Sequence, residues 1–385
     1  MTSAADRPLR ILYVFRAPVG GLFRNVYDVV KAMAERGHAV GILCDSTTGG
    51  ERGERLLKEL EPLLTLGIHR LPMRRNPHPS DITALRKVAE LVKLHDVDVV
   101  HGHGAKGGLY ARAAGVLSPN SGPIRCYTPH GGSLNFYPGS LAHKGFMLIE
   151  RLLERGTDLF LFESQFITDR YYEFVCVSKR PTLIALNGLY EHEFEAVVPN
   201  ADATDFLYVG EFREAKGIDT LVEALFLLAN EGFHPSITLV GSGPSEERIR
   251  ALTAERGIDG QFRWRGVTPA VEAFKLGRVM VVSSRFESLP YIVLEAVAGK
   301  LPLITTDVGG IPEIVTRDYH YLLPPNDPRR LAMVMKEVYR RPFADLKAEA
   351  ASLSDQIKMR FTVPLMVETV LSGYRMAMAQ RRPAA

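Results

Sequence analysis

The sequence predicts an α/β protein with two domains, each built on a doubly wound parallel sheet. Three observations predict this fold class. The chain has 385 residues, enough for two or three domains of ordinary size. Short apolar runs alternate with amphipathic helical patterns, which is typical of parallel sheets. The alternation starts again at about residue 206, so one domain pattern occurs twice.

The composition excludes several protein classes. With 46% hydrophobic and 24% charged residues, the chain is typical of globular proteins. A net charge of +3 is too small to indicate nucleic-acid binding. Cys44, Cys126 and Cys176 are widely spaced and indicate neither a disulfide framework nor a zinc site. Residues 1–10 lack the apolar segment of a signal peptide, and no run approaches 18 apolar residues, so a cytoplasmic protein is expected.

The first half begins with residues 10–15, a mostly apolar run that predicts a buried strand. Gly20-Gly21 follow, and apolar residues at helical spacing continue up to Gly37, where that helix is expected to end. The further strands expected in this half are residues 40–44, 97–101, 125–128, 159–162 and 182–186.

The second half repeats the order of strand and helix. Its expected strands are residues 206–210, 237–240, 261–265, 279–283 and 303–305, and residues 327–380 are expected to be helical. The predicted domains are 1–188 and 205–360, with a linker at 189–204 and a C-terminal helix at 361–385 that packs back on the first domain. Two such domains enclose a cleft, and ligands of open α/β sheets bind beyond the carboxyl ends of the strands.

The most informative motif follows the predicted strand 279–283. Glu287 lies before the expected helix and Glu295 lies about a turn and a half inside it, while Pro290 suits the first helical turn. Carboxylates at these positions accept hydrogen bonds from the hydroxyls of sugars and riboses, and the first-turn N–H groups suit a phosphate. Each Glu taken alone has an alternative explanation. Glu287 would stabilise the dipole of the helix as an acidic residue at its N-terminus, and Glu295 would be an ordinary exposed helical residue.

Residues 210–217 form a second strand-to-helix turn, which holds two cations. Arg213 and Lys216 suit a diphosphate, above all one that gains charge as it leaves. A solvated basic turn is the alternative. Gly241-Ser242-Gly243-Pro244 and residues 308–313 are two further turns at strand ends, and each is weak evidence alone.

Taken in order and spacing, the four motifs resemble glycosyltransferase family 4. The match rests on Gly-Glu-Phe-Arg-x-x-Lys-Gly from Gly210, Val-Gly-Ser-Gly-Pro from Val240, Glu287-x7-Glu295, and Asp-Val-Gly-Gly-Ile-Pro-Glu from Asp307. The order and spacing agree over nearly the whole chain. The resemblance implies a GT-B fold, in which two Rossmann-like domains face a central cleft, and a retaining transferase that uses nucleotide diphosphate sugars.

The resemblance also implies the roles of individual donor-side residues. Arg213 and Lys216 would bind the donor diphosphate, Glu287 the hydroxyls of the donor sugar, and Glu295 the nucleotide ribose. The other donor-binding residues would be Gly20, Gly21, Gly241, Gly266, Val267, Ser288, Leu289, Pro290 and Tyr291, with the nucleobase near Gly266 and Val267. Many members carry Arg directly after Gly210, where this chain has Glu211, so the diphosphate contact depends on Arg213 and Lys216.

Histidines follow two predicted strands of the first domain. By the resemblance, His101, His103 and Lys106 would line the acceptor side of the cleft, and His130 would lie beside the anomeric carbon. A packed core histidine is the alternative for His130. No acidic residue or third histidine accompanies His101 and His103 nearby, so no metal site is expected. The expected catalytic set is His130, Arg213, Lys216 and Glu287.

A basic cluster in the first domain would suit a second kind of partner, an anionic membrane surface. It consists of Arg70, Arg74, Arg75, Arg86 and Lys87, with Arg16, Arg24 and Lys31 nearby in the sequence. The resembling family often docks such a surface on anionic membranes to reach lipid-linked acceptors, and a solvated surface explains the cluster equally well. Residues 131–142, which include Phe136 and Tyr137, would suit a mobile loop over the acceptor site.

The expected function is transfer of a hexose from a UDP- or GDP-linked donor to a glycan or lipid-linked acceptor, in bacterial surface polysaccharide or lipopolysaccharide synthesis. No cofactor, metal or nucleic acid is expected. The protein would be cytoplasmic, or peripheral on the inner face of the cell membrane. Two alternatives stay open: a sugar-nucleotide epimerase of the same fold, which needs no acceptor, and a non-catalytic nucleotide-sugar-binding protein.

Overall fold

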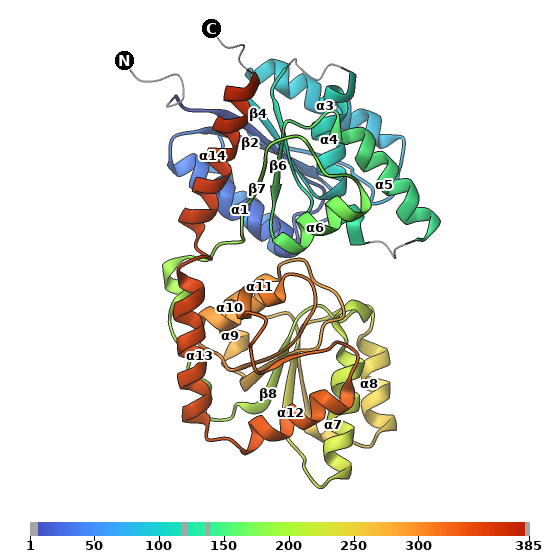
Figure 1. Cartoon of the computed structure of the whole chain (residues 1–385), viewed down its shortest axis with the longest axis vertical. Helices are drawn as coiled ribbons and strands as arrows, with labels where there is room; N and C mark the ends of the chain where they lie inside the picture. Colours follow the sequence, from blue (N-terminus) through green and yellow to red (C-terminus); the bar gives the residue numbers. More distant parts are fainter. Residues whose placement is uncertain (1–6, 118–121, 136–138, 382–385) are drawn as a thin grey trace. The chain divides into compact units, whose positions relative to one another are not determined.

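The computed structural model describes residues 7–117, 122–135 and 139–381. The chain divides into two compact units, drawn in Figure 1. Unit 1 consists of residues 1–188 and 363–385, and unit 2 consists of residues 189–362. Residues 189–204, expected as a linker, therefore belong to unit 2, where Phe194 and Val197 are buried.

Within its described residues, unit 1 contains one sheet of seven parallel strands in the order β3-β2-β1-β4-β5-β6-β7. The reversal of strand order next to β1 is that of a doubly wound sheet. The strands are β1 (Arg10–Val14), β2 (Ala39–Asp45), β3 (Gly67–Leu71), β4 (Val99–His103), β5 (Ile124–Thr128), β6 (Leu159–Phe162) and β7 (Thr182–Ile184).

Helices cover both faces of the unit 1 sheet. In Figure 1, α1 and α14 lie on one side of it, and α3, α4 and α5 lie on the other. The helices are α1 (Gly20–Glu35), α2 (Gly50–Leu60), α3 (Ser80–His95), α4 (Gly104–Leu117), α5 (Leu141–Glu154), α6 (Gln165–Phe174) and α14 (Val363–Arg381), with 3₁₀ turns η1 (Glu61–Leu63) and η2 (Gly132–Asn135). The last helix, α14, therefore returns to the unit in which the chain begins.

Unit 2 repeats the plan. Among the residues described, its sheet has six parallel strands in the order β10-β9-β8-β11-β12-β13. They are β8 (Thr204–Val209), β9 (Ile237–Val240), β10 (Phe262–Arg265), β11 (Gly277–Val282), β12 (Leu303–Thr306) and β13 (Leu322–Leu323). The strands β9, β8, β11 and β12, which precede the four sequence motifs, are neighbours in this sheet, so their carboxyl ends share one edge.

In unit 2, α7, α8 and α12 cover one face of the sheet, and α9, α10, α11 and α13 cover the other (Figure 1). The helices are α7 (Ile218–Asn230), α8 (Glu246–Glu255), α9 (Ala270–Phe274), α10 (Tyr291–Ala298), α11 (Ile311–Val315), α12 (Pro328–Arg340) and α13 (Phe343–Lys358), with η3 (Glu191–Phe194), η4 (Glu214–Lys216) and η5 (Asp259–Gln261). Leu221, Leu225 and Met335 meet the sheet from α7 and α12 and are fully buried.

The strands agree with the expected ones to within about two residues, apart from two that were missed. Gly67–Leu71 forms β3 and Leu322–Leu323 forms β13, and both lie at sheet edges. The strand β3 is only half-buried along its length and mixes His69 and Arg70 with apolar residues, so it lacks the continuous apolar run of a buried strand. The strand β4 runs on to His103 instead of ending at His101.

Candidate active site

The centre of the site in unit 2 is an ion pair between two of the predicted residues. Lys216 Nζ lies 2.6 Å from Glu287 Oε1, and their side chains are only 15% and 8% exposed. The Ser284 hydroxyl donates to the same oxygen at 2.6 Å. Neither contact uses Glu287 Oε2, so that oxygen is left to accept from a ligand hydroxyl. The structure thus joins the turn after β8 to the turn after β11.

Arg285 links the turn after β11 to the turn after β8 by hydrogen bonds and an ion pair. Its backbone N–H donates to Ala215 O at 2.8 Å, and its guanidinium donates to Glu214 O at 2.8 Å and pairs with Asp219 at 2.9 Å. Gly217 has a φ of +61°, and a Cβ there would lie 2.1 Å from Ser283 O. Only glycine permits so close an approach.

Two residues of this arrangement, Ser284 and Arg285, were missed as site residues. They directly follow the strand β11, and the rule that ligands bind at the carboxyl ends of parallel strands could have found them. Both act on the predicted residues: Ser284 orients the Glu287 carboxyl group, and Arg285 holds the turn that carries Lys216.

Arg213 lies on the same turn as Lys216 but at the surface. Its side chain is 50% exposed, and its Nε lies 3.4 Å from Glu211 Oε2. Ion pairs exposed to this extent contribute at most about 1 kcal/mol. Glu211 therefore does not prevent Arg213 from binding an anionic ligand.

Two glycines let neighbouring turns touch at this edge. Gly241 and Gly309 have φ values of +141° and +61°, which L side chains rarely adopt. A Cβ on Gly241 would lie 2.0 Å from Gly210 O, and a Cβ on Gly309 would lie 2.0 Å from Glu287 O. The glycines of both motifs therefore allow close backbone contacts between neighbouring turns at the edge of the sheet where Lys216 and Glu287 lie.

Three residues connect Glu287 to the first turn of α10. Ser288 O accepts from Gly310 N at 2.5 Å, and Leu289 and Tyr291 are buried. Pro290 is the N-cap residue, and Glu295 lies half-buried farther along α10. The dipole of α10 places its positive end at this turn, which favours a negatively charged ligand group.

The residues expected near the nucleobase follow β10. Val267 is 69% exposed, and a Cβ on Gly266 would meet nothing within 4 Å. This open turn is joined to the turn after β9, because Gly241 N donates to Arg265 O at 3.0 Å. The turn therefore leaves room for a ligand, although the structure assigns it no partner.

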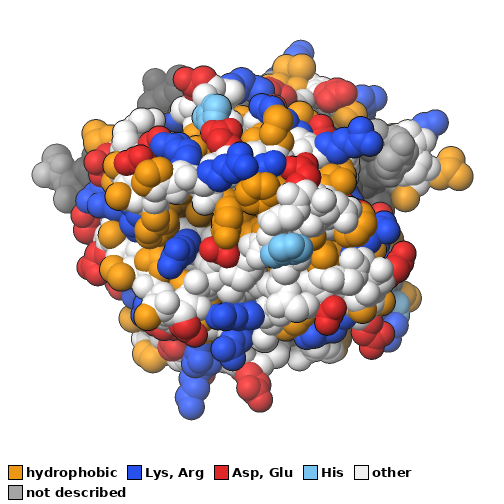
Figure 2. Space-filling model, turned by 90° about the horizontal axis from the view of Figure 1, so that it is seen from below, with side chains coloured by type: hydrophobic (Ala, Val, Ile, Leu, Met, Phe, Trp, Pro, Cys, Tyr) orange, Lys and Arg blue, Asp and Glu red, His pale blue; other side chains and the backbone are white. Residues whose placement is uncertain are grey.

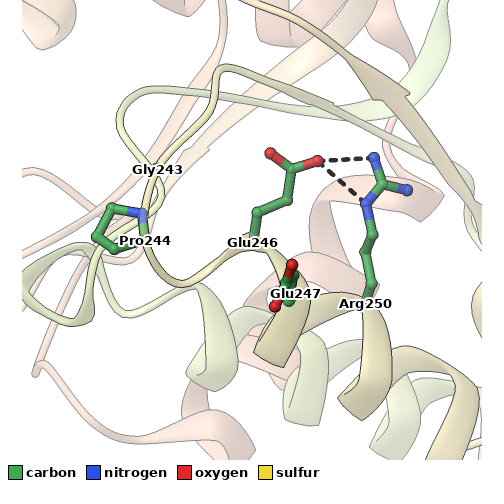
Figure 3. A pocket seen from close by; sticks show the side chains of 5 residues that line it. All are labelled: Gly243, Pro244, Glu246, Glu247 and Arg250. Carbon is green, nitrogen blue, oxygen red and sulfur yellow. Dashed lines mark hydrogen bonds and ion pairs between the residues drawn. The ribbon is translucent and has the colours of Figure 1, made fainter.

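A hollow of about 490 Å³ lies beside the Gly241 turn. It is lined by Gly243, Pro244, Glu246, Glu247 and Arg250. Figure 3 shows Glu246 and Arg250 pointing toward each other, and their ion pair measures 2.8 Å. Two carboxylates around one guanidinium do not suit a phosphate. The sequence carried no signal for this hollow, because Glu and Arg four residues apart are common on any exposed helix.

In unit 1, His101 lies within β4 and not in the turn after it. Alternate residues of a strand share a face, so the rings of His101 and His103 lie 4.0 Å apart. His101 is buried, with Nδ1 2.7 Å from Tyr374 Oη and Nε2 2.9 Å from Thr128 Oγ1. Because both ring nitrogens are engaged inside unit 1, this placement favours a core role over direct contact with an acceptor.

His103 and His130 form a second histidine contact, with Nδ1 and Nε2 2.9 Å apart. Burial lowers the pKa of His130 to about 3. Burial and the neighbouring histidines also hold the pKa of His103 well below its ordinary value. Both rings are therefore neutral at pH 7, and one donates its proton to the other.

The proton between these two rings has a preferred position. His103 Nε2 is buried without a hydrogen-bond partner among the described residues. A buried N–H without an acceptor is rarer in proteins than an unused acceptor, so the proton of His103 belongs on Nδ1. His130 then accepts at Nε2 and carries its own proton on Nδ1, as a donor for a ligand. His130 also holds an unusual φ of +50°.

The other predicted residues of unit 1 divide into two groups. Gly20 and Gly21 open α1, both are exposed, and a Cβ on Gly20 would meet nothing within 4 Å. Lys106 is engaged, because its Nζ lies 2.6–2.7 Å from both carboxyl oxygens of Asp81. Burial raises the pKa of Asp81, but hydrogen bonds, the largest from Lys106, outweigh it and bring that pKa below its ordinary value. Phe136 and Tyr137 lie outside the described residues.

Two family models match the chain, one in each half. Residues 19–189 match the family described as Glycosyltransferase Family 4, and residues 203–341 match the family described as Glycosyl transferases group 1. The chain is a GT-B glycosyltransferase.

Named relatives and solved structures resemble all or part of this glycosyltransferase. EpsD of Bacillus subtilis, named as a glycosyltransferase, is 26% identical over 324 residues, which are 79% of this chain and 83% of EpsD. WcaL of Escherichia coli, named for colanic acid biosynthesis, is 28% identical over 48% of each chain. The structure of Anabaena HepE with UDP-glucose superposes with a TM-score of 0.76 at 16% identity and covers 94% of this chain and 98% of HepE. This last likeness shows the shared GT-B fold.

The basic cluster of the glycosyltransferase is partly neutralised. Arg70 pairs with Glu54 at 2.5 Å, Arg24 with Asp28 at 2.6 Å, and Lys87 with Glu90 at 2.6 Å. Within the ranges that the structure describes, no helix combines the length and the apolarity needed to cross a bilayer. The cluster therefore offers fewer free cations than its sequence suggests.

The histidine cluster His101, His103 and His130 predicts an acid-labile unit 1. Burial lowers the pKa of His101 to about 3, close to that of His130, and lowers the pKa of His103 as well. Below pH 6.5 the unfolded chain binds protons that the folded unit does not, so stability falls as the pH falls from about 6.5 toward 3. Each histidine contributes up to about 1.4 kcal/mol per pH unit. Calorimetry at pH 7 and pH 5 should show a lower Tm for unit 1 at pH 5.

A His103→Asn variant is the matched control, because an amide nitrogen can replace Nδ1 as the donor to His130. The variant should lose less Tm than the wild type between pH 7 and pH 5. If the His103→Asn variant lost as much Tm between pH 7 and pH 5 as the wild type does, that result would contradict the assignment of His103 as neutral.

Proposed function

We propose that this glycosyltransferase moves a hexose from a UDP- or GDP-linked donor to a glycan or lipid-linked acceptor in bacterial surface polysaccharide or lipopolysaccharide synthesis. The observation that carries the donor assignment is the buried cluster of Lys216, Glu287 and Ser284 beside the N-terminus of α10. It combines a cation and amide N–H groups for phosphate with a carboxylate for sugar hydroxyls. HepE, which shares the fold, was solved with UDP-glucose, and WcaL is named for colanic acid biosynthesis.

In the proposed reaction, the bond between the anomeric carbon and the diphosphate breaks while the acceptor hydroxyl attacks from the same face. The acceptor proton passes to the leaving diphosphate oxygen, so the configuration is retained and no covalent enzyme intermediate forms. Lys216 and Arg213 stabilise the charge that develops on the diphosphate. Glu287 Oε2 accepts from donor-sugar hydroxyls, and Glu295 holds the ribose.

Unit 1 would supply the acceptor side of the reaction. The Nδ1 proton of His130 is the donor proposed for the sugar next to the reacting carbon. Gly20 and Gly21 leave space at the N-terminus of α1 for a phosphate to approach the backbone. Lys106 and His101 are not assigned to the acceptor, because their polar groups are engaged within unit 1.

We propose that the diphosphate needs no divalent metal, because two cationic side chains stand at its site. Activity measured with EDTA should equal activity without it. A strict metal requirement that is restored by Mg²⁺ or Mn²⁺ would contradict the roles given to Arg213 and Lys216.

The first test of the function is a donor screen. Purified protein is incubated with UDP- and GDP-linked hexoses, and release of the nucleotide by slow hydrolysis is followed. Release from one donor, lost in a Glu287→Ala variant, would identify the donor and support the site. Conversion of the donor sugar without any nucleotide release would point to the epimerase alternative. Binding of a donor with no release in the presence of any acceptor would point to a non-catalytic protein.

A further inference from the structure

The turn that carries His130 has an unusual backbone conformation. His130, Gly131 and Gly132 follow one another with φ values of +50°, +73° and +31°. The left-handed conformation is unfavourable for a residue with a side chain, so His130 keeps it only because surrounding contacts impose it. The contacts that impose this conformation also set where the His130 ring stands.

One carboxylate oxygen accepts hydrogen bonds from both sides of this turn. Glu150 Oε1, on α5, accepts from Tyr127 Oη at 3.1 Å and from Ser133 Oγ at 2.7 Å. Tyr127 lies three residues before His130, and Ser133 lies three residues after it. The side chains of Tyr127, Ser133 and Glu150 are all buried. Residues 127–133 are thus closed into a loop whose two ends are bound to the same atom.

Two further contacts support the turn at single points. The backbone N–H of His130 donates to Glu163 Oε2 at 3.3 Å, and the Arg170 guanidinium donates to Leu134 O at 2.8 Å. Each of them binds one point of the turn, whereas Glu150 binds residues on both sides of His130 and so fixes how the whole segment is closed.

The other oxygen of Glu150 is held by a buried arginine. Charged side chains ordinarily lie at the surface, as on the face drawn in Figure 2, where Lys and Arg side chains are interspersed with acidic ones. Arg112 and Glu150, by contrast, are 0% and 3% exposed, and Arg112 Nη2 lies 2.8 Å from Glu150 Oε2. The Arg112 guanidinium also donates from Nε to Gly108 O at 2.8 Å and lies 3.5 Å from the centre of the Tyr127 ring. Arg112 therefore holds both the carboxylate and one of its two hydroxyl donors.

This buried ion pair does little for stability. Removing two charges from water costs about as much free energy as their attraction returns. Arg112 Nη1 is in addition buried without a hydrogen-bond partner among the described residues, which is unfavourable. Apolar side chains could fill the space between α4 and α5, which lie side by side (Figure 1), without either cost. What apolar side chains could not supply is an acceptor for Tyr127 and Ser133.

We propose that Glu150 is a positioning residue for His130. By accepting from both ends of residues 127–133, it keeps the turn in its left-handed conformation and directs the Nδ1 proton of His130 toward the donor sugar. Because Glu150 is buried, it acts through Ser133 and Tyr127 and not by contact with the substrate. The role of Glu150 rests on the function proposed for His130, which is the group that it positions.

The test removes the two hydrogen bonds one at a time. Ser133→Ala deletes the hydroxyl after His130, and Tyr127→Phe deletes the hydroxyl before it but keeps the ring beside Arg112. Each should lower kcat for nucleotide release about tenfold, and the double variant about 100-fold, because a misplacement of about 1 Å has an effect of that size. The KM for the donor should change little, since the loss concerns an interaction made in the transition state.

Ser178→Ala is the matched control. The Ser178 hydroxyl also donates to a glutamate of α5, because it lies 2.9 Å from Glu154 Oε1, but Ser178 is outside residues 127–133. This variant should keep the wild-type kcat and KM. Circular dichroism should show the control and the test variants folded.

A double-mutant cycle with His130→Ala separates positioning from a general loss of structure. If Ser133 and Tyr127 act through His130, the Ser133→Ala/Tyr127→Phe substitutions should lower kcat little further once the His130 side chain is absent. A change that merely loosened unit 1 would lower kcat by the same factor in both backgrounds. That equal loss would overturn the proposal, and so would a wild-type kcat in the folded double variant.

Hydrogen exchange tests the same point without the reaction. The backbone N–H groups of His130 and Leu134 both donate hydrogen bonds in the turn. In the folded double variant they should exchange at least about tenfold faster than in the wild type, whereas the control variant should leave their exchange unchanged. Unchanged exchange in the double variant would overturn the proposal. Failure of the proposed function would appear differently, as no nucleotide release by the wild type or as a wild-type kcat in His130→Ala.

Discussion

The Lys216→Ala variant is expected to lose about 100- to 1,000-fold in kcat, the usual effect of removing one group that stabilises a developing anion. Lys216 contributes in two ways. Its ammonium group stands where the leaving diphosphate gains charge, and it pairs with the buried Glu287 carboxylate. Without Lys216, that carboxylate stays buried with only Ser284 as a donor, which also disfavours binding of an anionic donor. The measurement is steady-state kinetics with the donor found in the screen.

Lys275→Ala is the matched control, since Lys275 pairs with Glu272 at the surface of the same unit. It should keep the wild-type kcat. Circular dichroism should show both variants folded. Near-normal turnover by folded Lys216→Ala protein would remove Lys216 from the reaction and leave it a structural partner of Glu287.

The Gly309→Ala variant is expected to lower both stability and activity. The φ of +61° costs an alanine about 1–2 kcal/mol, and the new Cβ would lie 2.0 Å from Glu287 O. Relieving that overlap displaces one of the two turns at a further cost of about 1–3 kcal/mol. A total near 3 kcal/mol corresponds to a fall of about 6–12 °C in the Tm of a unit of this size. Donor turnover should fall as well, because Glu287 lies on one of the two turns that are in contact.

Gly260→Ala is the comparison, because a Cβ at Gly260 meets nothing within 4 Å and its φ is not positive. It should leave both Tm and turnover close to those of the wild type. If Gly309→Ala behaved in the same way, the contact between the turns after β11 and β12 would not be needed to position Glu287.

Most of the fold could be predicted because buried parallel strands are continuous apolar runs, such as Leu159–Phe162 and Ile237–Val240. The prediction missed β3, where His69 and Arg70 interrupt the run at the edge of the sheet. It also ended β4 too early, because a histidine at a strand end was taken to mark a turn. In the structure His101 is fully hydrogen-bonded inside unit 1, and no pattern in the sequence indicates its partner Tyr374, more than 270 residues away.

The candidate site could be located from its motifs, but its contacts could not. The sequence places Lys216 and Glu287 each just after a strand, yet only the structure shows that the two strands are neighbours and that the two side chains pair with each other. For α5, the sequence pattern would be misleading. Leu148 and Leu152 have the spacing of core residues, but the helix turns Glu150 inward to reach the buried Arg112, and this ion pair leaves the leucines outside.

The return of α14 to unit 1 has a consequence for synthesis on the ribosome. All of residues 189–362 must be translated before Tyr374 can reach His101 or Arg381 can reach Asp158. At about 5–20 residues per second, unit 1 waits about ten to forty seconds for its closing helix. During that time unit 2, a continuous segment, can complete its own folding, while the apolar sheet face that α14 will cover stays open to chaperones. The nascent chain therefore finishes its second half first, and a premature stop anywhere in unit 2 leaves the first half unfinished.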